Sequence, residues 1–179
     1  MAENMNRYKT YIAFDAYGVI DHENSNMPVY VRLERWAMEY PDRFCFVNTD
    51  DIDFSAEHED PVDSTVKGHF LQRMADADNL LVIASAKTHV ESPILNWQIS
   101  KAVNRYHLPV VVAYDGFDKV DEQTMVDFFG HLPNKIRKYM GRNSAPIAHI
   151  PLTKDKLERA LSSFSVKDGL FAWDSRTIF

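Results

Sequence analysis

The sequence predicts a single α/β domain built around a central parallel sheet. Continuous apolar runs at residues 11–14, 80–83 and 110–113 are typical of strands that are buried on both faces. Segments with helical spacing and helix-start signals separate these runs, and this short alternation favours a parallel sheet with helices on both faces. The length of 179 residues suits one domain with its own core.

The chain begins with a predicted strand and a predicted helix. The strand covers residues 8–15 and ends in a turn-like Asp-Ala-Tyr-Gly stretch. The Asn-Ser-Asn triplet at residues 24–26 precedes Pro28, a combination that marks a helix start. Apolar residues at helical spacing continue the helix to about Tyr40, where the next residue is a proline that stops it.

The next part of the chain alternates between short strands and less regular sequence. Residues 44–48 predict a second strand, in which Cys45 is interpreted as a small buried hydrophobe. The acidic stretch at residues 50–63 predicts a long solvated loop, since its spacing does not match a twelve-residue calcium loop. Asp63 or Ser64 caps the next predicted helix, and residues 79–84 give the clearest strand of the sequence.

Ser92 and the proline that follows it predict a sharp helix start, and this helix continues to about Tyr106. Residues 108–114 predict the fourth strand. Later elements have weaker patterns: helices at 121–129, 134–140 and 154–164, a strand at 147–150, and an apolar tail at 169–179 that packs back on the body.

In an open parallel sheet, ligands bind beyond the carboxyl ends of the strands. The predicted strand ends are residues 15–18, 48–51, 85–89 and 114–117, and we expect them to face one crevice.

Composition excludes several functional classes. The net charge of −6 and the isoelectric point near 5.6 argue against nucleic-acid binding as the main role. No apolar run reaches the roughly 18 residues that a membrane helix needs, and a single cysteine fits a reducing cytoplasm. Neither a glycine-rich phosphate loop nor a zinc-ligand pattern is present, so we expect no metal.

Gln98 is the one position that is unusual on physical grounds. It lies four residues after Ile94, three after Leu95 and four before Ala102, so it shares their inward stripe. A polar amide that points inward needs hydrogen-bond partners or a pocket. Gln98 is therefore either a core residue bonded to backbone or part of a site beside the crevice.

Ser85 and Thr88 follow the third predicted strand, and two interpretations stay open for them. Serine and threonine routinely stabilise turns through their hydroxyl groups. The same hydroxyls could line a pocket at the strand end.

Five segments together resemble the TIR-like domains of the bacterial Thoeris anti-phage system. They are Lys-Thr-Tyr-Ile-Ala-Phe-Asp at 9–15, Phe-Val-Asn-Thr-Asp-Asp-Ile at 46–52, Val-Ile-Ala-Ser-Ala-Lys-Thr at 82–88, Asn-Trp-Gln-Ile at 96–99 with Ala102, and Leu-Pro-Val-Val at 108–111. The resemblance implies a flavodoxin-like, TIR-type three-layer sandwich with about five parallel strands. Residues 1–179 would form one domain, with a core at about 8–115 and a C-terminal extension at 116–179.

The resemblance also implies an activity. Many members of this group cleave NAD between nicotinamide and ribose, and in Thoeris they release a cyclic or modified ADP-ribose that activates a partner effector. The family's catalytic glutamate falls on Gln98. The implied contacts to the substrate come from Phe14, Asp15, Ala16, Asn48, Asp50, Ser85, Thr88 and Trp97.

NAD would be the substrate, with no tightly bound cofactor. Trp97 is equally compatible with simple core packing. Asn48, Asp50 and the following Asp51 could instead meet a neighbouring subunit, so self-association is a further hypothesis.

Glutamine at this position predicts binding with poor turnover. Cleavage builds positive charge on the ribose, which a carboxylate stabilises and a neutral amide does not. Loss of one preorganised stabilising group costs about 3 kcal/mol, or roughly a hundredfold in rate. Gln98 is either an engineered trap, which its isosteric shape favours, or natural to a member that binds without cleaving. Glu91 is a nearby carboxylate that could substitute.

Two further functions remain as alternatives. The first is a non-catalytic TIR-like module that acts through assembly or nucleotide sensing. The second is another flavodoxin-like hydrolase or a nucleoside transferase of the deoxyribosyltransferase kind, which would need a glutamate that the sequence does not place.

Overall fold

A computed structural model describes residues 8–14, 22–47, 64–167 and 174–179. Their strands form one all-parallel sheet of six strands in the order β2-β1-β3-β4-β5-β6. The strands are β1 (Lys9–Ala13), β2 (Cys45–Phe46), β3 (Asn79–Ala84), β4 (Val110–Tyr114), β5 (Ile147–Pro151) and β6 (Thr177–Ile178). The first five follow the flavodoxin-like order, so the predicted fold class is confirmed, with six strands in place of about five.

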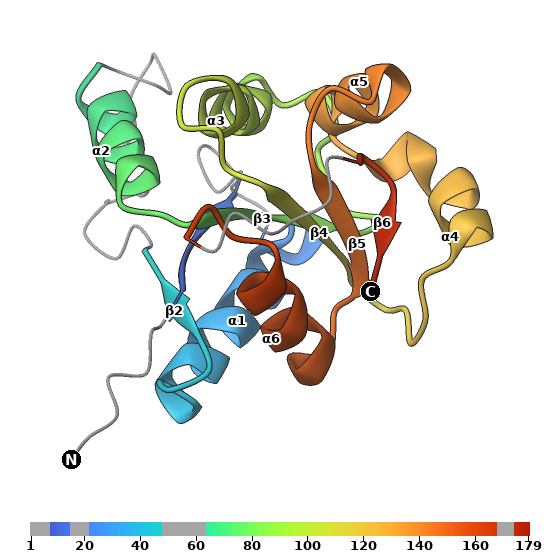
Figure 1. Ribbon diagram of the computed structural model, residues 1–179, viewed down its shortest axis with the longest axis horizontal. Coiled ribbons are helices and arrows are strands. Elements are labelled where there is room, and N and C mark those ends of the chain that lie inside the picture. The colour runs from blue at the N-terminus through green and yellow to red at the C-terminus, as the bar shows by residue number, and fades with distance from the viewer. Residues whose placement is uncertain (1–7, 15–21, 48–63, 168–173) are drawn as a thin grey trace.

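Helices cover both faces of this sheet, which gives three layers (Figure 1). The α-helices are α1 (Met27–Glu39), α2 (Ser64–Ala75), α3 (Pro93–Asn104), α4 (Glu122–Asp127), α5 (Asn134–Arg142) and α6 (Lys154–Ser163). Two short 3-10 helices are η1 (His22–Asn24) and η2 (Phe129–His131). α1 and α6 share one apolar core with the sheet, whereas α2, α3 and α5 share the other.

The central strands explain the continuous apolar runs of the sequence. Every residue of β3 and β4 is buried. Alternate side chains enter opposite cores: Leu80 and Val82 pack under α3, whereas Leu81 and Ile83 pack under α1 and α6. A strand covered on both faces carries mostly apolar residues along its whole length, so its pattern does not alternate with polar residues.

Local signals fix the start of α3 as predicted. The Ser92 hydroxyl accepts a hydrogen bond from the Leu95 backbone N–H at 3.3 Å, and Pro93 occupies the first helical position. α3 therefore begins just after the carboxyl end of β3, and its first turns lie beside the strand ends.

The structure differs from the sequence-based expectation at two edges of the sheet. β2 contains only Cys45–Phe46 instead of residues 44–48, and Cys45 is half-buried instead of buried because β2 is an edge strand. At the other edge, Thr177–Ile178 adds a sixth strand where we predicted only a packed tail. The predicted acidic loop at 50–63 and the apolar residues Leu170, Phe171 and Trp173 lie outside the described residues.

No helix in the described ranges is long and apolar enough to cross a membrane.

A buried histidine attaches the C-terminal segment to the sheet. His149 on β5 is fully buried, and its Nε2 lies 2.9 Å from the Ser175 backbone oxygen. Because a carbonyl only accepts, Nε2 carries the proton and donates, which leaves Nδ1 to accept from the Tyr114 hydroxyl at 2.9 Å. The backbone N–H of Ile147 also donates to the Asp174 carbonyl at 3.0 Å. The neutral imidazole therefore connects β4, β5 and the segment that leads into β6.

Burial lowers the pKa of His149 from an ordinary 6.5 to about 4. Arg176 lowers the pKa further, whereas the hydrogen bond to Ser175 and the charge of Asp174 raise it. The folded protein therefore binds a proton at His149 less readily than the unfolded chain does.

We expect this histidine to make stability fall on acidification. Its contribution, about 3 kcal/mol, is fully present above the unfolded pKa of about 6.5 and is lost as pH falls toward about 4. Urea unfolding between these pH values would measure the loss. The control is His149→Gln, which keeps a donor and an acceptor without titrating. Equal slopes of stability against pH in the two proteins would contradict this prediction.

Candidate functional site

The candidate site lies at the switch point of the sheet, where the chain leaves β1 toward β2 and later returns to β3. The carboxyl ends of β1 and β3 meet there, and open α/β sheets bind ligands at such points. Phe14 directly follows β1, and residues 85–88 follow β3. The start of α3 completes this region.

Gln98 of α3 is bonded to the end of β1. Its side chain is only 1% exposed. Oε1 accepts a hydrogen bond from the Tyr11 hydroxyl at 2.7 Å and a longer one from the Phe14 backbone N–H at 3.4 Å. Nε2 donates to the Phe14 backbone oxygen at 2.9 Å. The inward orientation predicted for Gln98 is thus observed, and the amide pairs with a backbone peptide, as the core interpretation expected.

A charged carboxylate could not make this pairing, whereas an amide makes it at any pH. The backbone of Phe14 offers an N–H donor and a carbonyl acceptor. The Gln98 amide accepts from the N–H through Oε1 and donates to the carbonyl through Nε2. A carboxylate could accept from Tyr11 and the Phe14 N–H, but it could not donate to the Phe14 oxygen. Burial also raises the pKa of Tyr11 well above its ordinary value, with the nearby Tyr30 adding to the rise, so its hydroxyl remains a donor.

Ser85, Thr88 and Asn26 form a second polar cluster at the end of β3. The Thr88 hydroxyl accepts from the Ser85 backbone N–H at 2.9 Å and from Asn26 Nδ2 at 3.1 Å. The Ser85 hydroxyl donates to Asn26 Oδ1, and the Thr88 N–H donates to the Ser85 carbonyl at 3.1 Å. The turn-stabilising role considered for Ser85 and Thr88 is therefore observed. Asn26 additionally connects this turn to the start of α1.

The cavity beside these groups is small. Its volume is about 10 Å³, enough for about one water molecule. It is lined by Ala13, Phe14, Ser25, Asn26, Ile83, Lys87, His89 and Leu95. The Phe14 ring stacks on Tyr30 with 4.6 Å between centroids, and Lys87 Nζ donates to the Glu23 carbonyl. A nucleotide would have to displace some of these contacts in order to enter.

Trp97 packs against α2. Its half-buried ring lies 6.5 Å from that of Phe70 on α2, and Lys67 and Lys101 lie over it at 5.7 and 6.0 Å. This agrees with the packing interpretation of Trp97. Glu91, considered as a substitute carboxylate, is exposed.

The other predicted contacts, Asp15, Ala16, Asn48 and Asp50, lie outside the described residues, as does Asp51. Within the part of the chain that is described, no group of three or more His, Cys, Asp or Glu side chains is arranged to hold a metal ion.

Sequence reasoning missed two participants. The local sequence indicates only a strand residue at Tyr11, although the need of a buried tyrosine hydroxyl for a partner is a signal that points to it. Asn26 was used only as a helix-start signal, and nothing in its local sequence indicates the long-range bonds to Ser85 and Thr88.

Comparison with known proteins identifies a family. Residues 11–119, more than half of the chain, match the family described as "Thoeris protein ThsB, TIR-like domain". A solved structure titled "Crystal structure of conserved protein from Enterococcus faecalis V583" is similar in fold, with a TM-score of 0.50 and 14% identity. The similarity covers 87% of this chain and 98% of that chain. No curated protein matches the sequence.

The hydrogen-bond pattern predicts a stability cost for Gln98→Glu. The introduced carboxyl can keep all three contacts only while protonated, so its folded pKa should rise above the unfolded value of about 4.3. Stability relative to the parent protein should therefore be highest below that value and fall by about 1–3 kcal/mol as pH rises to neutrality.

Thermal unfolding across acidic to neutral pH would measure this difference. Gln72→Glu makes the same chemical change at an exposed position of α2 and should leave stability nearly unaltered. Matching pH profiles for Gln98→Glu and Gln72→Glu would refute the requirement for an amide.

Proposed function

The chain belongs to the family of the TIR-like domain of the Thoeris protein ThsB, and from this membership we propose that it recognises NAD in anti-phage defence. The proposed reaction is cleavage of the bond between nicotinamide and ribose, with formation of a cyclic or modified ADP-ribose. That product would be the signal for a partner effector. NAD enters the proposal as substrate, without a tightly bound cofactor, in a reducing cytoplasm.

The observation that carries the proposal is the position of Gln98. It is buried at the switch point of the sheet, at the carboxyl end of β1. The resemblance places the family's catalytic carboxylate at this residue. When the glycosidic bond breaks, neutral nicotinamide leaves and positive charge develops on the ribose, which a carboxylate at this position would stabilise.

Gln98 can supply the hydrogen bonds of such a group but not its charge. Its Nε2 and Oε1, which are bonded to the backbone carbonyl and N–H of Phe14, have the donor and acceptor character that ribose hydroxyls require. Exchange of these partners would replace one set of hydrogen bonds with another at small net cost. We therefore propose that this form of the chain traps the nucleotide and cleaves it slowly.

A second function is favoured by one specific observation. In the described structure the Gln98 amide is already bonded to Tyr11 and Phe14, and the adjoining cavity measures about 10 Å³. A domain with this closed arrangement could act without catalysis, through assembly or by sensing a nucleotide. Self-association belongs to this alternative.

The first function predicts measurable binding without turnover. Calorimetry of the parent protein should detect NAD and ADP-ribose, whereas chromatography should detect little free nicotinamide. Gln98→Glu should release nicotinamide at least about a hundredfold faster, because it restores the negative charge. Gln72→Glu is the matched control and should behave like the parent protein.

Two outcomes would count against this function. An absence of nucleotide binding to both the parent protein and Gln98→Glu, together with concentration-dependent assembly in light scattering, would favour the non-catalytic alternative. Nucleotide binding with no cleavage by folded Gln98→Glu, even in phage-infected cells, would leave sensing as the function.

A further inference from the structure

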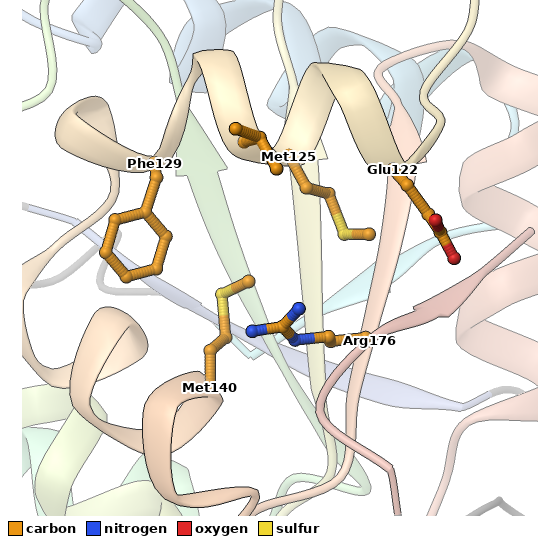
Figure 2. Close-up of a pocket in the computed structure, with 6 residues that line it drawn as sticks. Glu122, Met125, Phe129, Met140 and Arg176 are labelled. Atoms are coloured by element: carbon orange, nitrogen blue, oxygen red, sulfur yellow. The ribbon is translucent and has the colours of Figure 1, made fainter.

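A second, larger pocket lies between α4, α5 and the segment that enters β6 (Figure 2). Its volume is about 430 Å³, within the range of small-molecule sites. It is lined by Glu122, Met125, Val126, Phe129, Met140 and Arg176. None of these residues lines the cavity at the switch point. A function for this pocket is thus independent of the function proposed above.

The pocket combines a buried apolar floor with an exposed apolar rim. Met125 and Met140 are 5% and 4% exposed, whereas Val126 and Phe129 are 67% and 37% exposed. Methionine side chains adapt to irregular ligands and make favourable contacts with aromatic rings. An aromatic or large aliphatic group would cover this surface and remove it from water.

Two opposite charges enter the same pocket without meeting. Figure 2 shows Arg176 extending between α4 and α5, with Glu122 on the α4 side. Across the described ranges, neither side chain takes part in a hydrogen bond or ion pair; the bond of Arg176 to Asp174 uses its backbone N–H. The pocket therefore offers a cation and an anion that are both available to a ligand.

From this arrangement we propose that the pocket binds a free α-amino acid with a large apolar side chain. The ligand carboxylate would pair with Arg176, and its ammonium group with Glu122. The side chain would lie against Met125, Met140 and Phe129.

Other ligand classes fit the lining less well. A neutral apolar molecule would pair with neither of the two charges, so it would gain only from the apolar surface that it covers. A di- or triphosphate would bring several negative charges to one guanidinium, with Glu122 opposing them. A ligand with one charge of each sign offers a partner to each of the two groups.

Methionine-methyl NMR on the full chain tests this proposal directly. The protein has seven methionines, so the spectrum is simple to assign. Titration with L-phenylalanine to about 10 mM should shift the methyl signals of Met125 and Met140 saturably. Met38, which is 76% exposed on α1, should not move. No saturable shift of either pocket methyl would overturn the proposal.

Ligand analogues and variants test the two charges separately. 3-Phenylpropionate lacks the ammonium group and phenethylamine lacks the carboxylate, and each should bind at least about tenfold more weakly. Arg176→Gln and Glu122→Gln should each weaken L-phenylalanine binding to a similar extent. Lys138→Gln removes an exposed charge from α5 outside the pocket and is the matched control.

Equal binding of the two analogues and the amino acid would contradict recognition of a zwitterion. So would unchanged affinity in either Arg176→Gln or Glu122→Gln, provided that the parent pattern of methyl signals shows the variant to be folded.

Discussion

The contact between Gln98 and the end of β1 is the constraint on which the candidate site depends. One buried side-chain amide pairs with both the backbone N–H and the backbone carbonyl of Phe14, and the Tyr11 hydroxyl completes the set. These bonds hold the first turns of α3 against the strand that lies at the switch point of the sheet. Because the amide is buried, any partner that it loses must be replaced by another polar group.

This constraint connects structure and chemistry in the Thoeris TIR-like family to which the chain belongs. In the proposed reaction a carboxylate at residue 98 would supply the charge that glycosidic cleavage requires, but in the present arrangement it would face the Phe14 carbonyl oxygen. An amide does the opposite, because it hydrogen-bonds both backbone groups of Phe14 but carries no negative charge. The same residue therefore closes the end of β1 against α3 and, in the proposed reaction, would limit how well the transition state is stabilised.

The opposite edge of the sheet, toward β5 and β6, has a separate organisation. There the buried His149 connects β4 and β5 to the segment at Ser175. The next residue, Arg176, carries its side chain into the pocket between α4 and α5. The attachment of this segment thus positions one wall of a pocket that shares no lining residue with the switch-point cavity. Occupation of that pocket would stabilise the C-terminal segment through linkage.

The sequence by itself determined the parallel α/β fold, the three strands with continuous apolar runs, the start of α3 and the inward face of Gln98. These follow from burial patterns and capping signals that act over a few residues. Only the tertiary structure decided that Gln98 bonds Tyr11 and Phe14, and that a two-residue β6 pairs with β5. The tertiary structure alone also brings Glu122 and Arg176 into one pocket. Such contacts join residues far apart in the chain, and hydrophobic periodicity holds no information on which polar groups will meet.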